Sequence, residues 1–87
     1  MQFMRKVQIY TTRWCPFCDA AKSLFEEKGV PYEEVDAQNP DTRMAMIQRA
    51  HGRRTVPQIF VGDEHLGGYR EVMMLDREGK LDPLVGK

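Results

Sequence analysis

The amino-acid sequence predicts an α/β fold in which a four-stranded mixed sheet carries helices on its faces. Short β-branched segments alternate with segments of helical period along the 87 residues, in the order βαβαββα. The first two strands are joined through a helix, and a right-handed crossover makes such strands parallel. No linker, repeat or low-complexity segment interrupts this order, so we expect one domain that spans residues 1–87.

The four strands are predicted from short runs bounded by turn residues. Residues 6–11, KVQIYT, alternate β-branched and polar side chains, and residues 32–35, YEEV, form a weaker second strand. Residues 58–61, QIFV, form the third strand. The Gly-Asp-Glu turn at residues 62–64 leads into a brief fourth strand at residues 65–66, which should pair antiparallel with the third.

The first helix is predicted to begin at the cysteine pair. Pro16 suits a first helical turn, where its missing N–H removes no intrahelical hydrogen bond. Gly29 supplies the C-terminal stop. One face of this helix is apolar and consists of Cys18, Ala21, Leu24 and Phe25.

Two further helices and a final turn complete the prediction. Residues 39–52 form the second helix, which Asn39 or Asp41 caps. Residues 69–77 form the third helix. Residues 81–84 add a last turn at the C-terminus.

Composition and charge argue against several classes of function. Thirteen basic and thirteen acidic side chains cancel, so bulk electrostatics recruits neither nucleic acid nor a membrane surface. Arg49, Arg53 and Arg54 cluster, but we interpret them as a solvated helix end. No apolar run approaches the ~20 residues that span a bilayer, and residues 1–12 lack an apolar signal segment. Two cysteines are too few to staple a small secreted domain, so we expect a cytoplasmic protein.

The two cysteines, Cys15 and Cys18, are separated by two residues and fit a metal site, a structural bridge or a redox centre. A structural zinc ion needs four ligands. His51 and His65 fall in separate predicted elements and do not complete such a set, so we expect no metal. A C-x-x-C beside a βαβ unit is instead typical of a thioredoxin-like redox motif.

The position of Cys15 at a helix start favours the redox interpretation. Backbone N–H groups there lack intrahelical partners and the helix dipole is positive, and both effects stabilise a thiolate. A thiol pKa lowered from ~8.5 to ~5 would make Cys15 almost fully ionised at neutral pH. Arg13 either adds positive charge or points to solvent. Cys18 shares the apolar helix face, so we assign Cys15 as the attacking nucleophile and Cys18 as the resolving thiol of a redox-active disulfide.

Four motifs occur in order along the chain. They are CPFC at residues 15–18, TVPQIF at residues 55–60, GGY at residues 67–69 and LDPL at residues 81–84. Together they resemble the glutaredoxin family, in particular its small bacterial dithiol type, with Phe17 in place of the family's tyrosine. The resemblance covers nearly the whole chain and implies a thioredoxin-like fold.

The resemblance also implies a groove that binds glutathione. Val56 would offer its backbone N–H and C=O to the cysteinyl unit, beside a cis peptide bond at Pro57. Gly68 and Tyr69 would begin a helix whose free N–H groups suit the γ-glutamyl carboxylate, and Glu71 would meet the γ-glutamyl amine. The complete predicted groove set is Arg13, Phe17, Thr55, Val56, Pro57, Gly68, Tyr69, Arg70 and Glu71.

Three positions depart from the family pattern. Thr12 stands where many members have a lysine that pairs with a glutathione carboxylate, and Arg70 stands where Asp or Ser is usual. Met44 occupies a position that often holds a glutathione-binding Arg or Gln. Two interpretations stay open: Arg43, Arg70 and the predicted groove residue Arg13 restore the missing contacts, or they are solvated and glutathione affinity is reduced.

The implied function is that of a glutathione-dependent thiol–disulfide oxidoreductase, with glutathione as co-substrate. Cys15 would attack the mixed disulfide between a protein and glutathione, and the Cys15/Cys18 dithiol would reduce protein disulfides. The expected partners are glutathione and client proteins that carry a disulfide or a glutathione adduct. We expect a monomer without nucleic-acid or membrane partners.

Two alternatives remain open. One is an electron donor of glutaredoxin type that thioredoxin reductase serves, which Thr12 and Arg70 support. The other is a dimer that holds an iron–sulfur cluster through two copies of Cys15 and two glutathiones. Pro16 counts against the cluster, because family members with proline there usually hold none. The sequence also leaves open whether Met4 is an alternative start.

Overall fold

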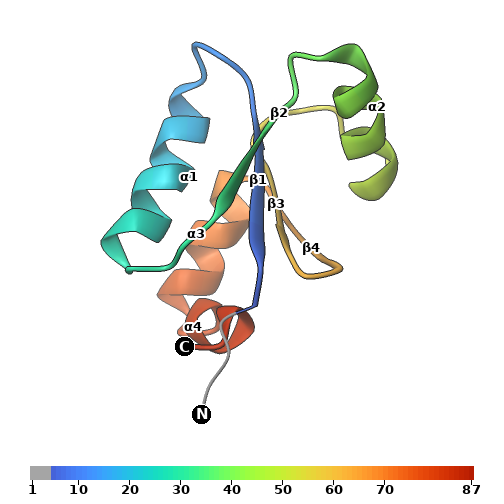
Figure 1. The fold of residues 1–87 in the computed structure, drawn as a ribbon. Helices are drawn as coiled ribbons and strands as arrows, with labels where there is room; N and C mark the ends of the chain where they lie inside the picture. The colour runs from blue at the N-terminus through green and yellow to red at the C-terminus, as the bar shows by residue number, and fades with distance from the viewer. Residues whose placement is uncertain (1–4) are drawn as a thin grey trace.

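The computed structural model describes residues 5–87 and has the predicted α/β architecture (Figure 1). Met4, the alternative start, lies outside the described residues. Among residues 5–87, no helix has the length and apolar character needed to cross a bilayer. The strands are β1 (Val7–Thr11), β2 (Glu33–Asp36), β3 (Gln58–Val61) and β4 (Glu64–Gly67), and the helices are α1 (Pro16–Glu27), α2 (Pro40–Arg49), α3 (Tyr69–Arg77) and α4 (Leu81–Val85).

The strands form one four-stranded sheet in the order β2-β1-β3-β4. β1 pairs parallel with β2 and antiparallel with β3, and β3 pairs antiparallel with β4, as the sequence predicts. Figure 1 shows α1 and α3 against one face of the sheet, with α4 at their lower end, and α2 on the opposite face. The mixed sheet and its two helical layers make the expected thioredoxin-like arrangement.

Two clusters of buried side chains fill the space on the two sides of the sheet. The smaller cluster, on the α2 side, consists of Tyr10, Ala37, Met46, Ala50 and Phe60. The larger cluster joins the sheet to α1, α3 and α4 and consists of Val7, Ile9, Ala21, Phe25, Val30, Ile59, Val61, Val72, Leu81 and Val85.

β3 contributes to both clusters because successive side chains of a strand point to opposite faces. Ile59 and Val61 belong to the larger cluster and Phe60 to the smaller one. Gln58, at the start of the strand, is also fully buried. Because β3 is buried on both faces of the sheet, its sequence after Gln58 consists of apolar residues without polar alternation.

β2 begins and ends one residue later than predicted, at Glu33–Asp36 instead of residues 32–35. The reason is that Tyr32 is used in packing: its ring lies 6.4 Å from that of Phe25, and its hydroxyl donates a hydrogen bond to Glu26. Tyr32 therefore belongs to the connection between α1 and β2.

α2 ends at Arg49, earlier than the predicted stop at Gly52. Ala50 is the C-cap and His51 adopts a left-handed backbone conformation with φ of 58°, so the chain has already left the helix. The prediction that Arg49 is a solvated residue is wrong. Its guanidinium lies 4.1 Å from the centre of the Phe60 ring and donates to the carbonyl of Gly62.

The predicted last turn is a separate helix, α4, so the order becomes βαβαββαα. Leu81 and Val85 of α4 are fully buried. Lys28, which follows α1, holds the helix in place, with its Nζ 2.6 Å from Asp76 and 3.0 Å from Asp82. Hydrogen bonds to these two carboxylates raise the pKa of Lys28.

We predict that Leu81→Ala lowers the free energy of unfolding by about 3 kcal/mol, because it opens a cavity in the larger cluster. Urea denaturation followed by circular dichroism measures this loss. Leu84→Ala is the matched control on the same helix, and its smaller loss is expected because Leu84 is only partly buried. Equal losses in the two variants would contradict the packing of α4 on the core.

Candidate functional site

Cys15 lies between the end of β1 and the start of α1. It is the N-cap of α1, and its Sγ accepts a hydrogen bond from the backbone N–H of Cys18 at 3.1 Å. The two cysteines form a disulfide with Cα atoms 5.1 Å apart. Cys15 is partly exposed, whereas Cys18 is buried in the apolar face of α1. An incoming thiol or disulfide can therefore reach Cys15 and not Cys18.

The same geometry favours a thiolate on Cys15 once the disulfide is reduced. The Cys18 N–H and the positive end of the α1 dipole both face its Sγ. Asp19, the acidic residue in the first turn, is paired with Lys22 at 3.6 Å, which limits its repulsion of a thiolate. The arrangement suits Cys15 as nucleophile and Cys18 as resolving thiol.

The loop before β3 faces the cysteine pair. The Val56–Pro57 peptide bond is cis, as the resemblance implies. The Val56 carbonyl oxygen lies 3.9 Å from Cys15 Sγ. Pro57 is buried and Thr55 is exposed. The segment that leads into β3 is thus a wall beside Cys15.

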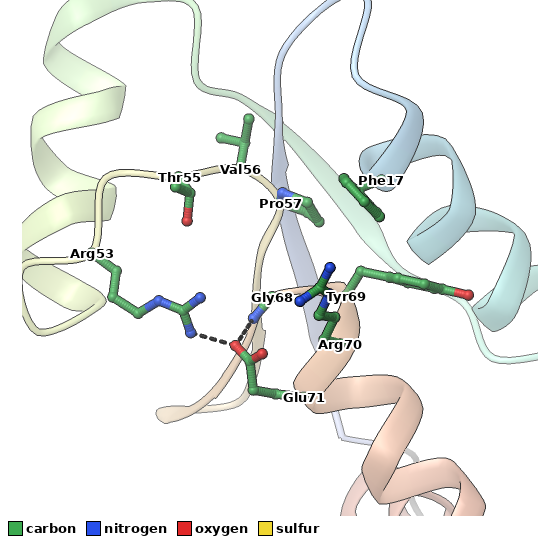
Figure 2. A pocket seen from close by; sticks show the side chains of 9 residues that line it. All are labelled: Phe17, Arg53, Thr55, Val56, Pro57, Gly68, Tyr69, Arg70 and Glu71. Atoms are coloured by element: carbon green, nitrogen blue, oxygen red, sulfur yellow. Dashed lines mark hydrogen bonds and ion pairs between the residues drawn. The ribbon is translucent and has the colours of Figure 1, made fainter.

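A groove of about 270 Å³ opens along this wall. Its lining comes from α1, from the loop before β3 and from the start of α3, which are far apart in sequence (Figure 2). All lining residues except Arg53 belong to the predicted groove set. The lining residues are Phe17, Arg53, Thr55, Val56, Pro57, Gly68, Tyr69, Arg70 and Glu71.

Arg13 is the member of the predicted set that the structure places elsewhere. With Thr12 and Trp14 it lines a separate depression, and its backbone N–H donates to Gln38 Oε1 at 2.7 Å. The sheet order puts this depression on the β2 side of β1, whereas the groove lies on the β3 side. Arg13 therefore does not line the groove.

Arg53 is a groove residue that the sequence analysis missed. Its guanidinium forms an ion pair with Glu71, and Glu71 Oε1 also accepts the Gly68 backbone N–H at 2.8 Å (Figure 2). The hydrogen bond from Gly68, followed by that from Arg53, lowers the pKa of Glu71. The sequence analysis interprets Arg53 as part of a solvated helix end, although its position two residues before the TVP segment is a signal that places it near the groove.

Aromatic side chains form the apolar part of the site. The rings of Phe17 and Tyr69 lie 6.1 Å apart at one side of the groove, and Phe17 is 54% exposed. Trp14, directly before Cys15, is 97% exposed and has a left-handed backbone with φ of 55°. Exposed aromatic side chains therefore both precede and follow Cys15 in the sequence.

The residues that depart from the family pattern, and the arginines expected to compensate for them, lie at different distances from the groove. Arg70 lines the groove, and Figure 2 shows its side chain rising from the start of α3 toward Pro57. No ion pair involves Arg70 within residues 5–87. Arg43 instead donates to the carbonyl of Arg54 at 2.7 Å, and Met44 is 53% exposed. Of the arginines considered as replacements, Arg70 is the one that reaches the groove.

The two histidines meet in space although they lie in separate elements. The rings of His51 and His65 are 5.5 Å apart. Two imidazoles alone do not complete a tetrahedral zinc site. In the part of the chain that the structure describes, no cluster of three or more His, Cys, Asp or Glu side chains is arranged to hold a metal ion.

Comparison with known proteins assigns a family. The family model described as Glutaredoxin matches residues 7–66, which is more than half of the chain. The chain is 46% identical over 87 residues to a probable glutaredoxin of Synechocystis sp., covering 98% of each sequence. It is 46% identical over 83 residues to glutaredoxin 3 of Escherichia coli, covering 94% of this chain and 99% of the relative.

Solved structures agree with these relatives. A glutaredoxin from Brucella melitensis superposes with a TM-score of 0.84 at 45% identity, covering 95% of this chain and 90% of that one. A buckwheat glutaredoxin–glutathione complex superposes with a TM-score of 0.83 at 31% identity, covering 91% of this chain and 74% of that one. The chain therefore belongs to the glutaredoxin family, and its C-x-x-C pair is that of a thiol–disulfide oxidoreductase.

Proposed function

We propose that this protein is a glutathione-dependent oxidoreductase that reduces protein–glutathione mixed disulfides and protein disulfides. The observation that carries the proposal is the placement of Cys15 Sγ 3.9 Å from the Val56 carbonyl, beside a groove that contains Arg53 and Arg70. The buckwheat relative is described as a complex with glutathione, which supports the choice of ligand.

The proposed reaction begins with attack of the Cys15 thiolate on the glutathione sulfur of a mixed disulfide. The client leaves as a thiolate and takes a proton from water, while Cys15 becomes bonded to glutathione. A second glutathione then attacks the bound glutathione sulfur, releases oxidised glutathione and restores Cys15. Alternatively, the Cys18 thiolate attacks Cys15 Sγ, expels glutathione and closes the disulfide, which two glutathiones later reduce. Couples of this kind lie at roughly −200 to −230 mV, near the cytosolic glutathione poise.

The groove provides contacts for the ends of the tripeptide. Glutathione carries two carboxylates and one ammonium group, so Arg53 and Arg70 suit the carboxylates and Glu71 suits the ammonium. The Gly68 N–H is already bonded to Glu71. The backbone N–H groups of Tyr69 and Arg70, in the first turn of α3, therefore bind the γ-glutamyl carboxylate in this proposal.

We also propose that the protein acts as a monomer in the cytoplasm. A reducing glutathione pool is needed to restore Cys15, and the cytoplasm supplies one. The groove is built from a single chain, so no second copy is required to complete it.

The electron source is the first prediction to test. A coupled assay offers the mixed disulfide of glutathione and cysteine, and supplies electrons either through glutathione and glutathione reductase or through thioredoxin reductase. We expect turnover with glutathione, because the groove keeps cations and an anion for the tripeptide. Turnover with thioredoxin reductase alone would contradict the proposal and support the alternative electron donor.

The proposed roles of the two cysteines predict that substituting them has different effects on activity. Cys15→Ser should abolish all turnover, because the accessible nucleophile is lost. Cys18→Ser should keep activity on glutathione mixed disulfides and lose dithiol reduction of protein disulfides, because only the internal disulfide requires Cys18. Rates with the cysteine–glutathione disulfide and with insulin as a protein disulfide separate the two activities. Full activity of Cys15→Ser would sink the assignment.

The position of Arg53 in the groove predicts that its removal weakens binding of the glutathione mixed disulfide. Arg53→Gln should raise KM for the glutathione mixed disulfide by about three- to tenfold, the effect of losing one charge-assisted contact. Arg54→Gln is the matched control, since Arg54 is the adjacent exposed arginine and does not line the groove. A KM increase of similar size in both variants would indicate a general charge effect and not a contact made by Arg53.

A further inference from the structure

The segment that carries the wall of the groove, residues 53–57, lies outside the strands and helices. The carbonyls of two of its residues are held by side chains from other elements. Arg43 of α2 donates to the Arg54 carbonyl at 2.7 Å. Gln58, at the start of β3, donates from Nε2 to the Thr55 carbonyl at 3.0 Å and contacts Thr55 Oγ1 at 3.2 Å. The position of Thr55, next to Val56, therefore depends on the side chain of Gln58.

Gln58 can make this contact in only one orientation. Its side chain is fully buried, so each polar atom of the amide needs a partner. The Thr55 carbonyl is purely an acceptor, which fixes the NH₂ group toward Thr55. The amide oxygen then points to His65, whose Nε2 lies 2.7 Å from Gln58 Oε1. His65 Nε2 must carry a proton for this bond to form.

The surroundings of His65 keep its ring in place for that bond. Its imidazole stacks on Phe60 with ring centres 4.9 Å apart and an angle of 29° between planes. Burial, followed by the nearby charge of His51, lowers the pKa of His65. A neutral imidazole has a single N–H, and the Gln58 contact places it on Nε2.

We propose that His65 is a positioning residue for thiol–disulfide exchange, which acts through Gln58 to hold Thr55 and Val56 at the groove. The hydrogen bonds run from His65 of β4 through Gln58 of β3 to the Thr55 carbonyl. The next residue, Val56, carries the carbonyl that lies 3.9 Å from Cys15 Sγ. His65 itself does not line the groove. The inference rests on the proposed glutathione function, since the segment that it places is the proposed binding wall for the tripeptide.

The decisive variants are His65→Phe and His65→Gln. Phenylalanine keeps the stacking on Phe60 and removes the N–H donor, whereas glutamine restores a donor at a similar reach. We expect KM for the cysteine–glutathione disulfide to rise about three- to tenfold in His65→Phe, with kcat within about twofold of the wild type, and to recover in His65→Gln. His51→Asn is the matched control: it alters the neighbouring ring, asparagine tolerates its left-handed backbone, and KM should not change.

A second readout does not need glutathione. Nuclear magnetic resonance should find the His65 proton on Nε2, and the backbone amide resonances of Thr55 and Val56 should shift in His65→Phe and return in His65→Gln. Should His65→Phe fail to fold, Gln58→Met interrupts the same chain of contacts at its centre and carries the same expectation. Wild-type protein without glutathione turnover would refute the proposed function, while these resonances would still test the positioning.

Two outcomes would overturn the positioning role of His65. One is an unchanged KM together with unchanged Thr55 and Val56 resonances in a folded His65→Phe protein. The other is an equal loss in His65→Phe and His65→Gln, because a lost donor would then not explain the effect.

Discussion

The site depends on the antiparallel pairing of β1 with β3. Tyr10, near the end of β1, is opposite Gln58, at the start of β3. The chain that leaves β1 toward Cys15 and the chain that enters β3 through Val56 therefore meet at the same edge of the sheet. Both strands are buried on the two sides of the sheet, which holds this register. Cys15 Sγ and the Val56 carbonyl come together because these strands pair, although they lie far apart in sequence.

The two cysteines differ because one helix serves two purposes. Its first turn directs the Cys18 N–H and the positive end of the helix dipole toward Cys15, and its apolar face buries Cys18. The Cys15 sulfur thus stays partly exposed at the surface, while Cys18 stays buried in the core. Because Cys18 is three residues from Cys15 and their Cα atoms are 5.1 Å apart, the disulfide between them needs no large movement of the chain.

A chain without net charge still makes a charged groove. Arg53, Arg70 and Glu71 gather at the junction of the loop before β3 and the start of α3, so two cationic groups and one anionic group line the groove. The ion pair between Arg53 and Glu71 also orders the N-terminus of α3, because Glu71 bonds to Gly68 at the same time. Local placement, and not overall composition, sets the electrostatics of this site.

The sequence by itself determined the strands, the first and third helices and the position of Cys15 at a helix start, because these depend on period, proline and cap residues close in sequence. It also indicated most of the groove through the TVP and GGY segments. Only the tertiary structure brought Arg53 to Glu71, put Arg13 on the β2 side and connected His65 to Thr55 through Gln58. Those contacts depend on which strands are neighbours in the sheet and on which side chains are buried. A short stretch of sequence specifies neither. The docking of α4 through Lys28 was decided in the same way, because Lys28 follows α1 whereas its two partners, Asp76 and Asp82, lie in α3 and α4.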